Sequence, residues 1–307
     1  MHLVIRRLKL FALTLFLVAP SVPAQEGRGD VVYVPTPQVV VDEMLRMAKV
    51  GPSDFVIDLG SGDGRIIITA AKKYGARGFG VDLDTYLLKL ANENARKEGV
   101  TDRARFIEQN LFETDLSRAT VITSYLLPEM NEKLRPKILA LKPGTRVVAH
   151  DYAMGEWEAD DDMTLVVPEK TVGDPGKSYI FLWIVPARIA GRWESQVTIG
   201  GRPLRSEFRF EQHFQMAQGT ARVGEWDLKL PQFRLEGEQL SFSVTIPVDG
   251  RSVTHRFAGK VNGDTIEGTV TAGEVPPQRV TSWTAKQTAR AEPDMGMAEA
   301  RVVGAAR

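Results

Sequence analysis

Cysteine is absent from this sequence of 307 residues, histidine is rare, and neither sign of charge prevails. Without cysteine the chain can form no disulfide, no thiolate metal site and no cysteine nucleophile. The four histidines are scattered and the acidic run at 158–162 lacks the spacing of a calcium loop, so we expect no metal site. The 39 basic and 39 acidic residues cancel, so no net field attracts a polyanion and we expect no nucleic-acid partner.

The first 24 residues have the pattern of a secretory signal peptide. Arg6, Arg7 and Lys9 precede a short apolar run at 10–19, and small residues at 22–24 offer a cleavage site. A segment that crosses a bilayer needs about 20 apolar residues, so cleavage is favoured over retention as an anchor. We therefore expect an exported, periplasmic or membrane-anchored protein associated with the envelope. If the signal is not used, the protein stays in the cytoplasm.

Residues 31–187 alternate short apolar strands with helical stretches, which is typical of a parallel sheet with helices on both faces. The expected strands are 55–59, 78–83, 104–108, 119–124 and 146–150, and the expected helices include 65–74, 86–99 and 128–141. Two last strands, 164–168 and 178–186, are joined by a polar connection that cannot hold a crossover helix, so they should form an antiparallel hairpin. The pattern predicts an α/β fold with the Rossmann-like, seven-stranded sheet of class I methyltransferases.

Beyond residue 187 the helical periodicity disappears. Alternating segments separated by glycine turns predict a small all-β, barrel-like domain at 188–288, closed or nearly closed. Its expected strands include 207–215, 225–230, 240–246, 253–257 and 265–271. Six aromatic residues either fill its core or line a ligand pocket: Trp193, Phe208, Phe210, Phe214, Trp226 and Trp283. We interpret the domain as a recognition or docking module, followed by a disordered tail at 289–307.

A glycine-rich loop follows the first expected strand. The sequence runs Asp58-Leu59-Gly60-Ser61-Gly62-Asp63-Gly64 and then enters the expected helix at 65–74. Sheets of this kind bind ligands at the carboxyl ends of their strands. Gly60 and Gly62 lack a Cβ, so the backbone can turn sharply and a ligand can lie against it. The loop alone suits any nucleotide-type cofactor.

Charges around the loop distinguish between cofactors. Arg65 stands where the dinucleotide fingerprint requires its third glycine. Asp58 and Asp63 would repel a pyrophosphate, whereas S-adenosyl-L-methionine carries an ammonium and a sulfonium but no phosphate. The loop therefore predicts S-adenosyl-L-methionine in preference to NAD.

Two further strand ends complete the expected cofactor site. Asp82 ends the second strand, where a carboxylate can accept two hydrogen bonds from a ribose diol. Asp84 or Thr85 is the better candidate for the cap of the next helix. Asn110 and Leu111 follow the third strand, and the Asn110 side chain can bond to the amino edge of an adenine.

Four motifs between residues 31 and 158 point to one family. They are Tyr33-Val34-Pro35-Thr36-Pro37, the loop at 58–65, Tyr125-Leu126-Leu127-Pro128 and Gly144-Thr145-Arg146-Val147-Val148. Together they resemble the protein-lysine methyltransferases related to the mitochondrial ATP synthase c-subunit lysine methyltransferase, and more closely their bacterial relatives. The resemblance implies N-methylation of a lysine side chain in a protein substrate. It also implies that the segment before the first helix closes over the cofactor, which makes Tyr33 and Thr36 candidates for its methionine end.

The cofactor-binding candidates are thus Tyr33, Thr36, Asp58, Gly60, Ser61, Gly62, Gly64, Asp82, Asn110 and Leu111. Tyr125, at the end of the fourth strand, is a candidate for the aromatic wall of the acceptor channel, with a packed structural tyrosine as the alternative. Two other functions stay open. One is methylation of a small molecule or lipid by the same fold; the other is non-catalytic binding by an exported protein through its β-domain. The sequence does not predict an oligomeric state.

Overall fold

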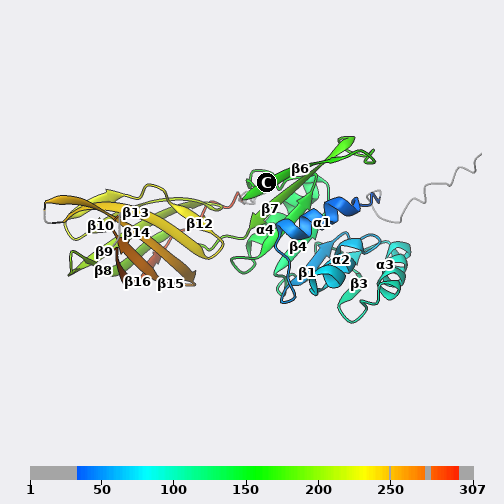
Figure 1. Ribbon diagram of the computed structural model, residues 1–307, viewed down its shortest axis with the longest axis horizontal. Helices are drawn as coiled ribbons and strands as arrows, with labels where there is room; N and C mark the ends of the chain where they lie inside the picture. The colour runs from blue at the N-terminus through cyan, green and yellow to red at the C-terminus, as the bar shows by residue number, and fades with distance from the viewer. Residues whose placement is uncertain (1–32, 249, 274–277, 297–307) are drawn as a thin grey trace, which may run out of the picture.

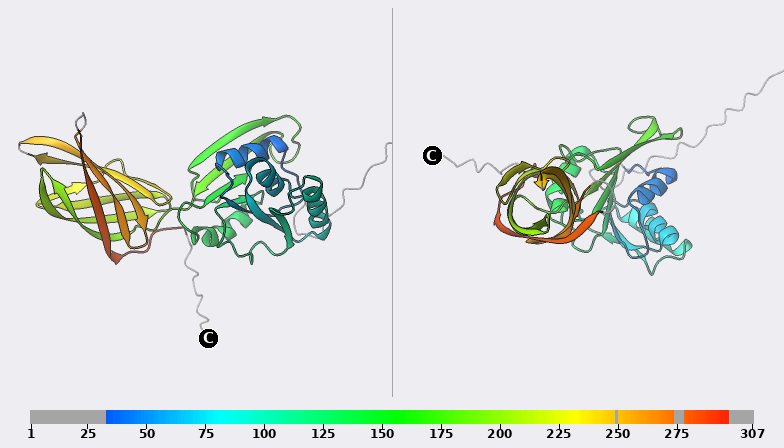
Figure 2. Two further views of the ribbon diagram at one scale, coloured as in Figure 1. Left: turned by 60° about the horizontal axis from the view of Figure 1, so that its bottom comes forward. Right: turned by 60° about the vertical axis from the view of Figure 1, so that its left-hand side comes forward.

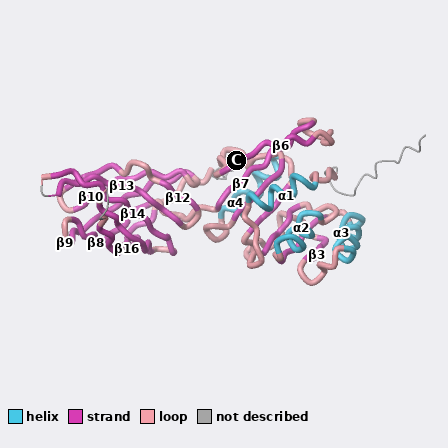
Figure 3. Tube along the Cα trace, in the orientation of Figure 1, coloured by secondary structure: helices cyan, strands magenta, loops and turns pink. Residues whose placement is uncertain are grey.

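The computed structural model describes residues 33–248, 250–273 and 278–296, which fold into an α/β domain followed by an all-β domain (Figure 1). The predicted signal segment at 1–24 lies outside the described residues. In the described part of the chain, no helix is long and apolar enough to cross a membrane. Helices occur in the first domain, and the second is built from strands and turns (Figure 3).

The α/β domain contains the expected seven-stranded sheet, with the strand order β3-β2-β1-β4-β5-β7-β6. Its strands are β1 (Phe55–Leu59), β2 (Arg77–Asp82), β3 (Ala104–Glu108), β4 (Val121–Ser124), β5 (Arg146–His150), β6 (Asp161–Val167) and β7 (Gly176–Ile184). The first five pair in parallel, and β7 runs antiparallel to both β5 and β6. The Rossmann-like sheet with a terminal hairpin is therefore confirmed.

Helices cover both faces of this sheet, as the sequence predicts. They are α1 (Gln38–Met47), α2 (Arg65–Tyr74), α3 (Thr85–Lys97) and α4 (Pro128–Leu139). Apolar residues of α1, α2 and α3 pack on one face, and those of α4 pack on the other. Asp84 caps α3, because its carboxylate accepts hydrogen bonds from the backbone N–H groups of Tyr86 and Leu87. That leaves Asp82 free for another role.

The second domain, which we call the β-domain, is one antiparallel sheet of nine strands in the order β11-β10-β9-β8-β16-β15-β14-β13-β12. Its strands are β8 (Gly191–Ile199), β9 (Arg202–His213), β10 (Met216–Val223), β11 (Trp226–Lys229), β12 (Arg234–Glu236), β13 (Gln239–Val248), β14 (Arg251–Asn262), β15 (Thr265–Ala272) and β16 (Arg279–Arg290). The sheet rolls around a central axis, as the right-hand view of Figure 2 shows.

The predicted barrel is rolled but not closed by strand pairing. The edge strands β11 and β12 follow each other in the chain, and they are not paired in the described sheet. The chain between them contains Pro231, which has no N–H to donate, and Gln232, whose φ of 56° belongs to a turn. These residues interrupt the ladder at the seam.

Aromatic side chains fill the interior of the rolled sheet. Trp193, Phe208, Phe257 and Trp283 are at most 1% exposed, and the ring of Phe208 lies edge-on to those of Phe257 and Trp283. Trp226 packs at the margin of this cluster, whereas Phe214 belongs to a different cluster, shared with the α/β domain. Of the two interpretations of these aromatic residues, the structure favours a packed core.

Phe214 and the end of the described chain join the two domains. The Phe214 ring stacks on Trp157 with centroids 6.1 Å apart and receives the Arg135 guanidinium 5.6 Å from its centre. The Arg135 side chain also donates to the Gly296 carbonyl at 2.7 Å, and Met295 is buried. The prediction of disorder from residue 289 is therefore wrong for 289–296, because β16 extends to Arg290 and the following residues pack against the α/β domain.

Candidate active site

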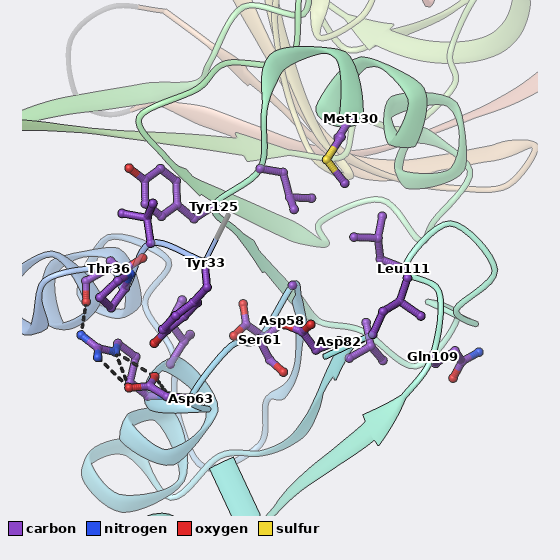
Figure 4. A pocket seen from close by; sticks show the side chains of 18 of the residues that line it. Tyr33, Thr36, Asp58, Ser61, Asp63, Asp82, Gln109, Leu111, Tyr125 and Met130 are labelled. Carbon is purple, nitrogen blue, oxygen red and sulfur yellow. Dashed lines mark hydrogen bonds and ion pairs between the residues drawn. The ribbon is translucent and has the colours of Figure 1, made fainter. Parts of the chain in front are cut away.

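A cleft of about 230 Å³ opens at the carboxyl ends of the parallel strands, where the sequence predicts the cofactor site (Figure 4). Figure 4 shows Asp82, Gln109 and Leu111 toward one end and Tyr33, Thr36 and Asp63 toward the other. The lining includes nine of the predicted site residues: Tyr33, Thr36, Asp58, Gly60, Ser61, Asp82, Asn110, Leu111 and Tyr125. The other two predicted residues, Gly62 and Gly64, are not among the lining residues.

Gly62 and Gly64 permit close contacts within the protein. A Cβ built on Gly62 would come within 2.3 Å of the Tyr33 ring, and one on Gly64 would come within 2.5 Å of Phe106. Both glycines have positive φ angles, 51° and 82°, which other residues rarely adopt. Gly62 therefore lets Tyr33 lie on the loop, and Gly64 lets the start of α2 pack against β3.

Two polar side chains in the loop are buried. Asp58 is 2% exposed and accepts a hydrogen bond from the Thr123 hydroxyl at 2.6 Å. Burial raises the pKa of Asp58 to about 7, and the nearby Asp82 carboxylate adds to the effect. Ser61 Oγ is buried with no partner among the described residues, although Ser61 lines the cleft. A ligand with a cationic group and hydrogen-bonding atoms would satisfy both side chains.

The Asp63 carboxylate is not the free negative charge that the sequence predicts beside the cofactor. Its carboxylate pairs with Arg65 at 2.6 Å, and Arg65 also donates to the Thr36 carbonyl at 2.6 Å. The Asp63 charge is thus neutralised locally, and the preference for a cationic cofactor depends on Asp58 and Asp82 instead. Arg65 ties the segment at 33–36 to the loop, a role that its place in the motif does not reveal. The ring of Tyr33 in that segment is partly buried, which together with Asp63 raises the pKa of Tyr33 to about 12.

Asp82 and Asn110 hold the backbone around the cleft. Asp82 accepts hydrogen bonds from the N–H groups of Gly62 at 2.9 Å and of Asp84 at 3.0 Å. Asn110 Oδ1 accepts from the N–H of Phe112 at 2.9 Å. Each of these oxygens keeps a second lone pair, so both side chains can still accept from a ribose or an adenine.

Tyr125 forms one wall of the cleft beside Leu126 and Met130. Its ring centre lies 4.0 Å from that of His150, and its hydroxyl donates to Asp151 at 3.0 Å. Burial lowers the pKa of His150 to about 4, so this imidazole is uncharged at neutral pH. The sequence does not indicate Met130 and Gln109 as lining residues, because nothing near them distinguishes them from ordinary helix and loop residues.

Comparisons with known proteins agree with this geometry. The model of the ANTKMT methyltransferase domain family matches residues 58–161. A protein-lysine N-methyltransferase of Saccharolobus islandicus is 50% identical over 127 residues, which cover 41% of this chain and 79% of that protein. The ATP synthase c-subunit lysine N-methyltransferase of Xenopus laevis is 33% identical over 129 residues, which cover 42% of this chain and 56% of that protein.

A solved structure is also similar, that of an RNA methyltransferase from Salinibacter ruber in complex with S-adenosyl-L-homocysteine. It is 46% identical, has a TM-score of 0.46 and covers 51% of this chain and 96% of its own. The identity to the Saccharolobus relative, most of whose length is matched, establishes the family. The cofactor of this family, S-adenosyl-L-methionine, fits three polar groups of the cleft: the buried Asp58, the Ser61 hydroxyl, which has no partner among the described residues, and the Asp82 carboxylate. This chain belongs to the family of S-adenosyl-L-methionine-dependent methyltransferases that includes the protein-lysine N-methyltransferase of Saccharolobus islandicus.

Proposed function

We propose that the protein is a protein-lysine N-methyltransferase. The observation that carries the proposal is the composition of the cleft wall, where Tyr125, Leu126 and Met130 stand together. Such a wall suits the methylene chain of a lysine, and burial beside it favours the uncharged amine that can attack a methyl group. The lysine substrates named for the two curated relatives support the same acceptor.

The proposed reaction needs little acid or base chemistry from the protein. S-adenosyl-L-methionine supplies the methyl group on a sulfonium, which is already a good leaving group. The chain's own residues bind the acceptor and the cofactor, orient them toward each other and exclude water. Asp82 would hold the ribose, while Asp58, Ser61 and Tyr33 would contact the remainder of the cofactor. The uncharged His150 behind Tyr125 adds no cation that would repel a developing ammonium.

We propose that the β-domain is a docking module that acts away from the chemistry. Among the described residues, all that line the cleft lie between Tyr33 and Met130, and none belongs to the β-domain. The turn at Gly237 contacts Gly144, which precedes β5 and lies at the amino ends of the parallel strands. The cleft is at the opposite ends. A substrate that binds the β-domain would therefore reach the cleft around the side of the α/β domain.

We also propose that the N-terminal segment directs the protein to the envelope, by export or as an anchor. The support is the basic cluster before the apolar run at 10–19 and the small residues at 22–24. Determining the N-terminal residue of protein purified from fractionated cells tests this. A mature chain that starts near residue 25 agrees with export. An intact Met1 in the cytosolic fraction argues against it.

Incubation of the purified protein with an envelope extract and radiolabelled cofactor tests the proposed activity. We expect label in protein, at lysine, and no label in a parallel extract whose lysines have been acetylated beforehand. Label in lipid, in a small molecule or in added RNA would identify that molecule, and not protein lysine, as the methyl acceptor. Calorimetric titration with S-adenosyl-L-methionine and with NAD is the companion measurement. A folded chain that binds neither would act by non-catalytic binding.

A further inference from the structure

A buried ion pair lies behind the aromatic wall of the cleft. Lys170, in the connection between β6 and β7, places its Nζ 2.6 Å from Oδ2 of Asp151, which follows β5. The two side chains are only 4% and 5% exposed. A lysine side chain is rarely buried this completely unless it is paired with an oppositely charged group. The same Oδ2 of Asp151 accepts the hydrogen bond from the Tyr125 hydroxyl, so the ammonium and the phenol converge on one oxygen.

The rest of the surroundings hold Asp151 in one orientation. Its other oxygen accepts from the N–H of Tyr179 at 3.1 Å, and its backbone has a φ of 62°, which non-glycine residues seldom adopt. Gly173 packs against the ion pair, since a Cβ at this position would lie 3.4 Å from Asp151 Oδ2 and 3.7 Å from Lys170 Nζ. Asp151 is therefore a fixed acceptor and not a mobile surface carboxylate.

Tyr125 is held from a second side by His150. The imidazole packs against the phenol ring and is itself fixed at both nitrogens. Nδ1 shares a hydrogen bond of 3.3 Å with the Thr36 hydroxyl, and Nε2 shares one of 3.0 Å with the Ser178 hydroxyl. In Figure 4 the Tyr125 hydroxyl points away from the glycine loop, so the ring itself forms the wall. The orientation of that wall depends on the hydroxyl anchor at Asp151.

We propose that Lys170 is a positioning residue for methyl transfer, which acts through Asp151 to fix the ring of Tyr125. Without the ammonium, the buried Asp151 carboxylate would lose its counter-ion and turn toward water. The phenol then loses its fixed acceptor, and the packing of His150 alone no longer fixes the orientation of the ring within the cleft. A wall that moves no longer aligns the acceptor amine with the methyl group, although the cofactor still binds. This inference rests on the proposed function, because it assigns Tyr125 to the acceptor side of the site.

A double-mutant cycle tests the proposal. It compares the wild type with Lys170→Met, Tyr125→Phe and the double variant, and it includes Lys170→Arg and the exposed-site control Lys97→Met. We expect Lys170→Met to lower kcat about tenfold with an unchanged calorimetric Kd for the cofactor. In the Tyr125→Phe background, which already lacks the anchored hydroxyl, the same change should alter kcat by less than about twofold. Lys170→Arg should recover most of the activity, because guanidinium can pair with the same carboxylate.

Several results would overturn the proposal. They are an unchanged kcat in Lys170→Met, an equal loss of kcat in both backgrounds, or a loss that appears in the Kd for the cofactor instead. If Lys170→Met does not fold, the pair Lys170→Met with Asp151→Asn replaces it in the cycle, because it removes both charges together. Wild-type turnover on lysine decides the proposed function separately. If the wild type labels another acceptor, the cycle is run on that acceptor, so failure of one proposal is not failure of the other.

Discussion

The ring of Tyr33 lies against Gly62 so closely that a single added methyl on Gly62 would come within 2.3 Å of it. Because Tyr33 is also 36% exposed, its ring covers the loop from the solvent side. The family resemblance implies that the segment before the first helix closes over the cofactor, and this contact shows how the loop accommodates that segment.

Gly62→Ala should therefore weaken cofactor binding. The new methyl displaces the Tyr33 ring and strains a backbone with φ of 51°, so we expect the Kd for S-adenosyl-L-methionine to rise at least about tenfold by calorimetry. Gly99→Ala is the matched control, because Gly99 also has a positive φ but no atom within 4 Å of its Cβ position. Equal losses of affinity in the two variants would mean that a general loss of stability, and not the contact with Tyr33, is responsible.

Asp58→Asn should stabilise the cofactor-free protein at alkaline pH. Burial raises the pKa of Asp58 from 3.8 to about 7, so between these values the folded chain keeps a proton that the unfolded chain has released. Stability from this group therefore falls as the pH rises from about 4 to about 7 and is constant above. At pH 8 the asparagine variant should gain up to about 4 kcal/mol in the free energy of unfolding.

Urea unfolding at pH 5 and at pH 8 measures this difference. We expect the gain of Asp58→Asn to be larger at pH 8, while the exposed control Asp162→Asn shows the same stability as the wild type at both values. The same variant should bind the cofactor more weakly, because it lacks the carboxylate that meets a cation. A gain that is independent of pH would contradict the assignment of a raised pKa.

Tyr125→Ala should lower kcat far more than Tyr125→Phe. Alanine removes the wall and we expect a loss of about a hundredfold, whereas phenylalanine keeps the ring, loses only the hydrogen bond to Asp151 and should lose about tenfold. Steady-state methylation with saturating cofactor gives both values. Tyr86→Ala, at an exposed position on α3, is the control. If both Tyr125 variants turn over like the wild type, Tyr125 is a structural residue only.

Phe214→Ala should loosen the junction between the domains without affecting the cleft. The ring is 1% exposed, stacks on Trp157 and receives Arg135, so its loss should cost about 3–5 kcal/mol in the free energy of unfolding. We expect faster proteolysis between the domains and an unchanged Kd for the cofactor. The exposed neighbour Met216 serves as the control, as Met216→Ala. A changed Kd would reveal coupling between the junction and the cleft.

Much of the fold can be predicted from the local pattern of apolar and polar residues, because each buried position of a strand requires an apolar side chain. Val56 and Ile57 are fully buried in β1, and the alternation that predicts β9 and β14 is the alternation of their buried and exposed residues. The open seam was not predictable in this way. Whether β11 and β12 pair depends on the local geometry at Pro231 and Gln232 and on the twist of all nine strands.

The site divides along a similar line. The glycine loop and Asp82 are readable because strand ends carry them to one edge of the sheet. Lys170 gives no such signal, since in sequence it belongs to a polar connection between two strands. Only the fold brings the Lys170 ammonium to Asp151. Tyr179, whose N–H also donates to Asp151, is 28 residues away from Asp151 in the sequence. Contacts of this kind arise from long-range packing, and neither residue type nor spacing indicates them.

The pairing of β8 with β16 brings the two ends of the β-domain together. Its first and last strands are neighbours, and where the chain leaves it the N–H of Ala291 donates to the carbonyl of Ala190 at 3.1 Å. The chain therefore enters and leaves the β-domain side by side, and the polypeptide returns to the α/β domain at the place from which it departed. A module with this arrangement can be replaced through one short splice between Ala190 and Ala291, provided that the replacement covers the Trp157 surface against which Phe214 packs.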